Sequence, residues 1–170
     1  KFDSAYFIRW ANIAVSVVAE QSKELADSVI GIVNNYEPIL ELLSEQPVTL
    51  VHNDLSPKNV LADASVKPSR ICFIDWEMAG AGCGLLDLVH LKYGLDPINE
   101  KKLCDAYFSE LAGSRLIPTT LEDLNCLIAS CELHKTMYRL ARSKDWKIPS
   151  DILTNWVSEA QANLNRVHQV

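Results

Sequence analysis

The sequence Val-His-Asn-Asp-Leu-Ser-Pro-Lys-Asn-Val-Leu at 51–61, followed by Ile-Cys-Phe-Ile-Asp-Trp-Glu at 71–77, gives the strongest structural signal in the chain. Each stretch combines a short apolar run, typical of a β-strand, with polar residues at its end. Asp54, Asn59 and Asp75 therefore lie at strand ends or in the loops between strands. Because hairpins bring the ends of neighbouring strands together, we expect these three side chains to meet.

Short strands are predicted around these loops, and helices are predicted on both sides of them. Apolar β-like runs cover 48–51, 60–62 and 70–74, and the last two are a predicted hairpin. The glycine-rich segment 80–84 is predicted to be a flexible turn, because it lacks the G-x-G-x-x-G order of a dinucleotide-binding loop. Apolar residues at helical spacing predict helices over 7–18, 25–36, 39–43, 85–91, 99–111, 119–138 and 150–167.

Three of the later helix ends carry recognisable signals. Gly113 is predicted to end the helix over 99–111. Thr119 and Glu122 have the spacing of a capping box, and Ser150 is predicted to cap the last helix. The apolar stripe predicted for that last helix consists of Ile152, Leu153, Trp156, Ala160, Leu164 and Val167.

The polar residues in the loops are of the types that phosphoryl transfer requires. One carboxylate must orient the attacking hydroxyl and accept its proton, while oxygen ligands hold Mg²⁺ beside the phosphates. Mg²⁺ takes hard oxygen ligands, usually with only one or two carboxylates among them. Asp54 is therefore a candidate base, and Asn59 and Asp75 are candidate Mg²⁺ ligands, with ATP or GTP as the phosphoryl donor.

The order His-x-Asp-x-x-x-x-Asn, followed by a strand that ends in Asp, resembles the catalytic loop and metal-binding turn of the kinase fold. Over 52–88 the chain is similar to the aminoglycoside phosphotransferase and choline kinase superfamily, through His-Asn-Asp-Leu, Phe-Ile-Asp-Trp-Glu-x-Ala-Gly and a later Asp-Leu. The resemblance implies an α+β, mainly α-helical fold, that of a kinase-like C-terminal lobe. It implies a catalytic loop over 51–61, a metal-binding turn over 71–84 and a helical substrate-side subdomain over 85–170.

The resemblance also implies a role at each matching position. Asp54 is then the catalytic base, Asn59 and Asp75 bind the metal, and His52 braces the metal-binding turn. Asp87 ties a buried helix to the catalytic loop.

Two further positions have more than one interpretation. Glu77 either supports the site or is simply structural, and Lys58 either approaches a phosphate of the nucleotide or points into solvent. Asn53 stands where antibiotic kinases often carry Gly and where choline-kinase-like members resemble this sequence, so the substrate alcohol stays open.

The parts that precede the catalytic loop in the kinase fold are not recognisable. Only 51 residues precede His52, and they contain neither a Gly-rich loop nor a strand with the nucleotide-binding lysine. We therefore expect the N-terminal ATP lobe to be absent and this chain to be inactive alone, which phosphorylation of a substrate by the chain would disprove. An exposed lobe surface would favour a homodimer. The alternative function is a non-catalytic helical binding or scaffold module derived from such a lobe.

The composition of the chain bears on which classes of partner and which compartment are expected. The 170 residues suit one domain or lobe, and a net charge of −6 argues against nucleic acid, whose binders are usually basic. No apolar run reaches the roughly 18 residues that cross a membrane. Five cysteines without a metal or redox spacing are predicted to be mostly buried, reduced thiols, so we expect a cytoplasmic protein.

The expected partner is a small hydroxylated molecule such as an aminoglycoside, choline or a similar alcohol. A cationic substrate would suit an acidic rim on the later helices, although solvated helix faces explain the same residues. The candidate rim consists of Glu122, Asp123, Glu132, Asp145 and Asp151.

Overall fold

The computed structural model describes residues 1–111 and 121–168, which form two compact units. Residues 1–46 and 118–170 make up the helical unit, and residues 47–117 make up the β unit. Helices dominate, and every strand of the described residues pairs in an antiparallel way, so the predicted mainly helical α+β class is confirmed. The helices predicted over 85–170 are divided between both units.

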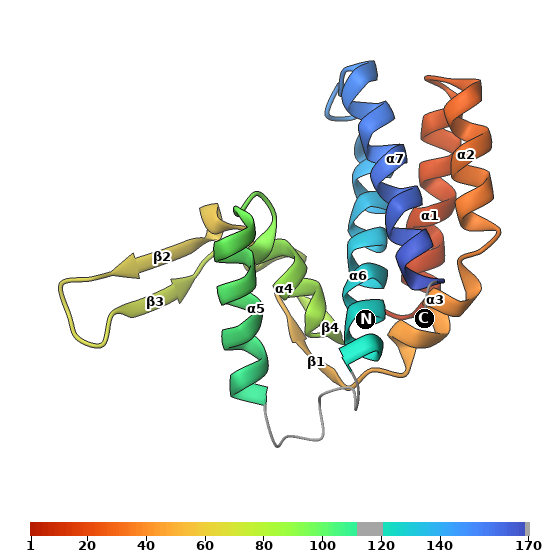
Figure 1. Cartoon of the computed structure of the whole chain (residues 1–170). Coiled ribbons are helices and arrows are strands. Elements are labelled where there is room, and N and C mark those ends of the chain that lie inside the picture. Colours follow the sequence, from red (N-terminus) through yellow and green to blue (C-terminus); the bar gives the residue numbers. More distant parts are fainter. Residues whose placement is uncertain (112–120, 169–170) are drawn as a thin grey trace. The chain divides into compact units, whose positions relative to one another are not determined.

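The helical unit is a four-helix bundle with one short helix packed on it (Figure 1). The four long helices are α1 (Ser4–Ala19), α2 (Lys23–Val33), α6 (Leu121–Arg142) and α7 (Ser150–Val167). α1 packs against α2 and α6, and α7 packs against the same two helices, so the ring is closed. The short helix α3 (Glu37–Ser44) packs against α1 and α6.

Local sequence explains how the bundle begins. The buried residues of α1 are Phe7, Ala11, Ala14 and Val18, which recur every three or four positions and so lie on one helix face. Asp3 caps α1 by accepting a hydrogen bond from the backbone N–H of Tyr6, and Ser22 caps α2 in the same way from Leu25.

The last helix corrects part of the predicted core. Val157 is buried although it was not in the predicted stripe, whereas Ile152 is 38% exposed. The ring of Trp156 lies 5.1 Å from the guanidinium of Arg139, so this tryptophan forms a cation–π contact. Ser150 is the first residue of α7 and does not cap it, because Pro149 occupies the cap position. Gly113 and the capping box from Thr119 to Glu122 lie outside the residues whose side chains are described.

The buried phenol of Tyr36 leads to a stability prediction. Tyr36 is fully buried, and its hydroxyl has no hydrogen-bond partner among the described residues. Burial, with Cys131 nearby, raises the pKa of this phenol far above its ordinary value. An unsatisfied buried hydroxyl costs about 1–3 kcal/mol, so we expect Tyr36→Phe to raise the free energy of unfolding by about 1 kcal/mol in urea denaturation. A loss of more than 1 kcal/mol would show that the hydroxyl is bonded.

The β unit consists of two antiparallel strand pairs and two helices. β1 (Val48–Val51) pairs with β4 (Gly80–Cys83), and β2 (Val60–Asp63) pairs with β3 (Arg70–Phe73). The predicted hairpin is therefore confirmed. The prediction of a flexible turn over 80–84 is wrong for the first four residues, because they form β4. Its Gly-Ala-Gly sequence has no side-chain alternation, although its backbone pairs with β1 in full register.

Gly84 follows β4 at the start of α4 (Leu85–Lys92), which packs against α5 (Pro97–Leu111). A methyl group at Gly84 would lie 3.2 Å from Cγ2 of Thr49 and 3.3 Å from the hydroxyl of Tyr107. A larger residue at position 84 would therefore require the side chain of Thr49 or Tyr107 to shift by a few tenths of an ångström.

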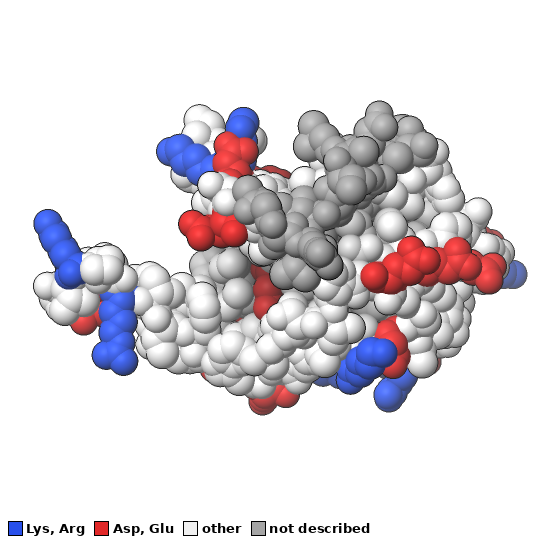
Figure 2. All heavy atoms as spheres, turned by 90° about the horizontal axis from the view of Figure 1, so that it is seen from below, with Lys and Arg blue, Asp and Glu red and all other residues white. Residues whose placement is uncertain are grey.

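The β2–β3 hairpin projects away from α4 and α5 within the β unit (Figure 1). Leu61, Ile71 and Phe73 are each more than 40% exposed on it. The projecting end carries Lys and Arg side chains, while much of the rest of the hairpin is uncharged (Figure 2).

Two remaining sequence predictions concern cysteines and membranes. All five cysteines are in the thiol form, as predicted. Cys83 and Cys131 are buried, Cys104 and Cys126 are half-buried and Cys72 is exposed, so the prediction of mostly buried thiols is wrong for Cys72 of the hairpin. Among the described residues, the helices are too short or too polar to cross a membrane.

Candidate active site

The loop between β1 and β2 and the turn between β3 and β4 lie next to each other in the β unit. The loop contains a single turn of 3₁₀ helix, η1 (Pro57–Asn59), and the turn contains another, η2 (Trp76–Met78). Because β2 pairs with β3 and β1 pairs with β4, both segments leave the strands at the same place. The sequence predicted that strand pairing would bring the loop and the turn together, and these two pairings do so.

His52 joins the loop to the turn through both nitrogens of its buried ring. Its Nε2 lies 2.8 Å from the carbonyl oxygen of Ile74, and its Nδ1 lies 3.3 Å from the backbone nitrogen of Asp54. A carbonyl can only accept a hydrogen bond and a backbone N–H can only donate one. The ring is therefore the neutral tautomer with its proton on Nε2, and it fixes the backbone at Asp54 and Ile74 together.

Asp87, in the first turn of α4, holds the start of the same loop. Its Oδ2 accepts the backbone N–H of His52 and its Oδ1 accepts that of Asn53, both at 2.8 Å. Burial raises the pKa of the Asp87 carboxyl above its ordinary value, and the two N–H donors oppose this only in part. Asn53 has a φ of 62°, a left-handed conformation that asparagine adopts more readily than most residues.

Asn59 is buried and fixes the Asp54 carboxylate. Its amide nitrogen donates to the backbone oxygen of Asp54 at 2.7 Å and to Oδ2 of Asp54 at 3.0 Å. Both amide hydrogens are thus used, and the carbonyl oxygen Oδ1 of Asn59 is the end of the amide that can bind a cation.

The two oxygens of Asp54 are in different situations. Oδ2 accepts the bond from Asn59 and also lies 3.2 Å from Nζ of Lys58, whose side chain is 68% exposed. Within the described part of the chain, Oδ1 has no hydrogen bond. Since the Asp54 side chain is one-third exposed, Oδ1 is the oxygen from which a substrate proton can be accepted.

Asp75 follows Ile74 in a left-handed conformation, with φ 66° and ψ 57°. The backbone of Ile74 is held on both sides, because its N–H donates to the Asn59 carbonyl at 3.1 Å and its carbonyl meets His52. The Asp75 carboxylate is exposed and makes no hydrogen bond or ion pair with any described residue. A strained backbone that presents an unused carboxylate is typical of functional sites.

The donor set of Asn59 and Asp75 suits Mg²⁺, which prefers hard oxygen ligands from one amide or a few carboxylates. In contrast, the described residues contain no cluster of three or more His, Cys, Asp or Glu side chains that would hold a metal through those residues alone. The two predicted ligands are therefore compatible with a metal that also binds phosphate oxygens and water.

The turn also contains one predicted residue outside this network and one aromatic residue that sequence reasoning missed. Glu77 is exposed on η2 and bonds to none of the described loop residues. Trp76 packs on His52 with ring centroids 4.6 Å apart, and its Nε1 donates to the carbonyl of Phe73 at 2.9 Å. The position of a large aromatic residue directly after Asp75 was the only signal for this contact.

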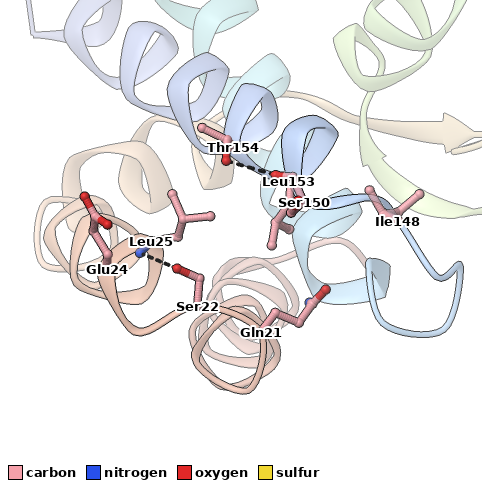
Figure 3. A pocket seen from close by; sticks show the side chains of 8 residues that line it. All are labelled: Gln21, Ser22, Glu24, Leu25, Ile148, Ser150, Leu153 and Thr154. Atoms are coloured by element: carbon pink, nitrogen blue, oxygen red, sulfur yellow. Dashed lines mark hydrogen bonds between the residues drawn. The ribbon is translucent and has the colours of Figure 1, made fainter.

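The helical unit contains the residues of the predicted acidic rim and a separate hollow. Glu132 forms an ion pair with Arg166, and Asp145 forms one with Arg142. The side chains of Glu122 and Asp123 lie outside the described residues. A hollow of about 340 Å³ lies where α1 leads into α2 and α7 begins, and Figure 3 shows its lining: Gln21, Ser22, Glu24, Leu25, Ile148, Ser150, Leu153 and Thr154. None of the predicted site residues is among them.

Comparison with known proteins gives one result that bears on this geometry. The family model described as the phosphotransferase enzyme family matches residues 2–116, a range that contains every predicted site residue. A search of curated proteins finds no match.

Proposed function

The chain belongs to the phosphotransferase enzyme family, a family of kinase-like phosphotransferases, and we propose that it is the C-terminal lobe of an enzyme that phosphorylates a hydroxyl group of a small molecule. The phosphoryl donor is ATP or GTP. The observation that carries the proposal is the Asp54 carboxylate, which is anchored through Oδ2 and open at Oδ1 beside the Asn59 amide.

In the proposed step, Oδ1 of Asp54 accepts the proton of the substrate hydroxyl. The hydroxyl oxygen forms a bond to the γ-phosphorus, and the bond from that phosphorus to the bridging oxygen breaks. The electron pair of the broken bond leaves with the nucleoside diphosphate. Catalysis of this kind rests on positioning and on electrostatic stabilisation more than on covalent chemistry.

The chain's other residues hold this arrangement in place. Asn59 through Oδ1 and Asp75 through its carboxylate would hold Mg²⁺, which when bound offsets the negative charge of the phosphates. His52 and Asp87 keep the loop and the turn in register through backbone hydrogen bonds. Lys58 would approach a phosphate or the substrate, and Glu77 would support the site without contacting the substrate or would be simply structural.

The free thiols suit a reducing compartment, and we place the protein in the cytoplasm on that basis.

The proposal is tested by measuring Mg²⁺-dependent nucleotide consumption by the full-length protein with aminoglycosides, choline, ethanolamine and homoserine. We expect one class of alcohol to stimulate consumption of ATP or GTP and to gain one phosphoryl group by mass spectrometry. EDTA should abolish the reaction. If no alcohol is phosphorylated and the protein binds no nucleotide, the non-catalytic binding module becomes the better explanation.

A further inference from the structure

Lys58 is a cationic side chain in direct contact with the candidate base Asp54. Its Nζ is 3.2 Å from Oδ2 of Asp54, four residues away along the chain. The backbone between them is fixed, because Pro57 begins η1 and the N–H of Asn59 donates to the Ser56 carbonyl at 2.8 Å. The Lys58 side chain therefore extends from a fixed backbone position beside the Asp54 carboxylate, to which the substrate hydroxyl would bind.

The position of this ammonium constrains what is bound next to the reacting hydroxyl. The hydroxyl must reach Oδ1 of Asp54, which is the other oxygen of the carboxylate that Lys58 contacts. Substituents on the neighbouring carbon then lie within several ångströms of Nζ. Unit charges at such distances interact appreciably even near a solvated surface.

Part of the candidate acidic rim is already paired among the described residues. Glu132 and Asp145 of the candidate acidic rim are paired with arginines. Asp54 already faces a lysine, so its charge is in part neutralised before a substrate arrives.

We propose that Lys58 selects a substrate whose reacting hydroxyl neighbours an anionic or neutral group and that it disfavours a cationic one. This inference rests on the proposed phosphotransferase function and specifies its substrate class. The group recognised by Lys58 is an anionic oxygen such as a carboxylate, and Lys58 acts as a specificity-determining residue.

The test compares three acceptors that share a three-carbon diol and differ in one charge: glycerate, glycerol and protonated 3-amino-1,2-propanediol. For each, kcat/KM is measured where it is phosphorylated, and Ki where it only competes with the alcohol found in the turnover assay. With the full-length wild-type protein at low salt, we expect preference for glycerate over glycerol and for glycerol over the amine, by roughly tenfold at each step.

The variants separate charge selection from a structural role. Lys58→Gln should flatten the order, Lys58→Glu should reverse it, and Lys58→Arg should restore it. Lys67→Gln, which removes an exposed lysine from the hairpin loop of the same unit, should leave the order unchanged. Added salt should weaken the preference, because the charges are near solvent.

Three results would overturn the inference in different ways. An order that favours the amine, or one unaffected by Lys58→Gln, removes charge selection while leaving the phosphotransferase function intact. A rise in KM for the nucleotide in Lys58→Gln, equal for all three acceptors, assigns Lys58 to the nucleotide phosphates instead. Absence of nucleotide consumption with every alcohol would refute the proposed function and the inference with it.

Discussion

Replacing Asp54 with Asn should lower kcat by about 10² to 10⁴ while the protein remains folded. This is the range that general-base catalysis contributes, and the reason lies in the local geometry. The Asn59 amide and Lys58 both contact Oδ2, which leaves Oδ1 open to take the proton of the hydroxyl. An asparagine keeps the shape of the side chain but cannot accept that proton.

The measurement is steady-state turnover of the full-length protein with its accepted alcohol, accompanied by thermal unfolding of both forms. Lys101→Gln is a suitable control, because it removes an exposed charge that pairs only with the exposed Asp105. We expect the control to keep kcat within twofold. A loss of less than tenfold in Asp54→Asn would show that another group is the base.

Replacing Asp87 with Ala should lower the free energy of unfolding by about 3 kcal/mol. The backbone N–H groups of His52 and Asn53 would lose their acceptor at the start of the catalytic loop. Each buried donor left without a partner costs about 1–3 kcal/mol. Because the same contacts position Asp54, we also expect kcat to fall.

Urea denaturation of the purified protein checks this expectation, with Asp87→Asn as the matched variant. The asparagine retains one acceptor oxygen, so its loss should be about half that of alanine. Asp105→Ala, at a surface ion pair, should change the free energy of unfolding by less than about 1 kcal/mol. Equal stability of Asp87→Ala and the wild type would mean that the loop is not held by α4.

The loop and the turn could be predicted because their spacing is short and their residue types are specific. Asp54 and Asn59 are five positions apart in one loop and are hydrogen-bonded, and Asp75 follows the end of the partner strand β3 by two residues, next to Ile74, whose N–H donates to the Asn59 carbonyl. His52 and Asp87 were expected to brace this region, and their contacts are now seen in atomic detail.

Other features depend on contacts that no local pattern reveals. β4 has a Gly-Ala-Gly sequence without alternation, and only its pairing with β1 makes it a strand. The packing of α1 on α6 and of α2 on α7 joins segments more than 100 residues apart. In α7, Arg139 of the neighbouring helix draws Trp156 into a cation–π contact, and Val157 is buried.

The most direct test of phosphoryl transfer to a hydroxyl activated by Asp54 is to follow the label from γ-³²P-ATP with the full-length protein, Mg²⁺ and the accepted alcohol. We expect the label to appear as a phosphate monoester of the small molecule, with none retained on the protein. We expect Asp54→Asn to prevent this. Label found only as inorganic phosphate, or bound to the protein, would contradict direct transfer to a hydroxyl activated by Asp54.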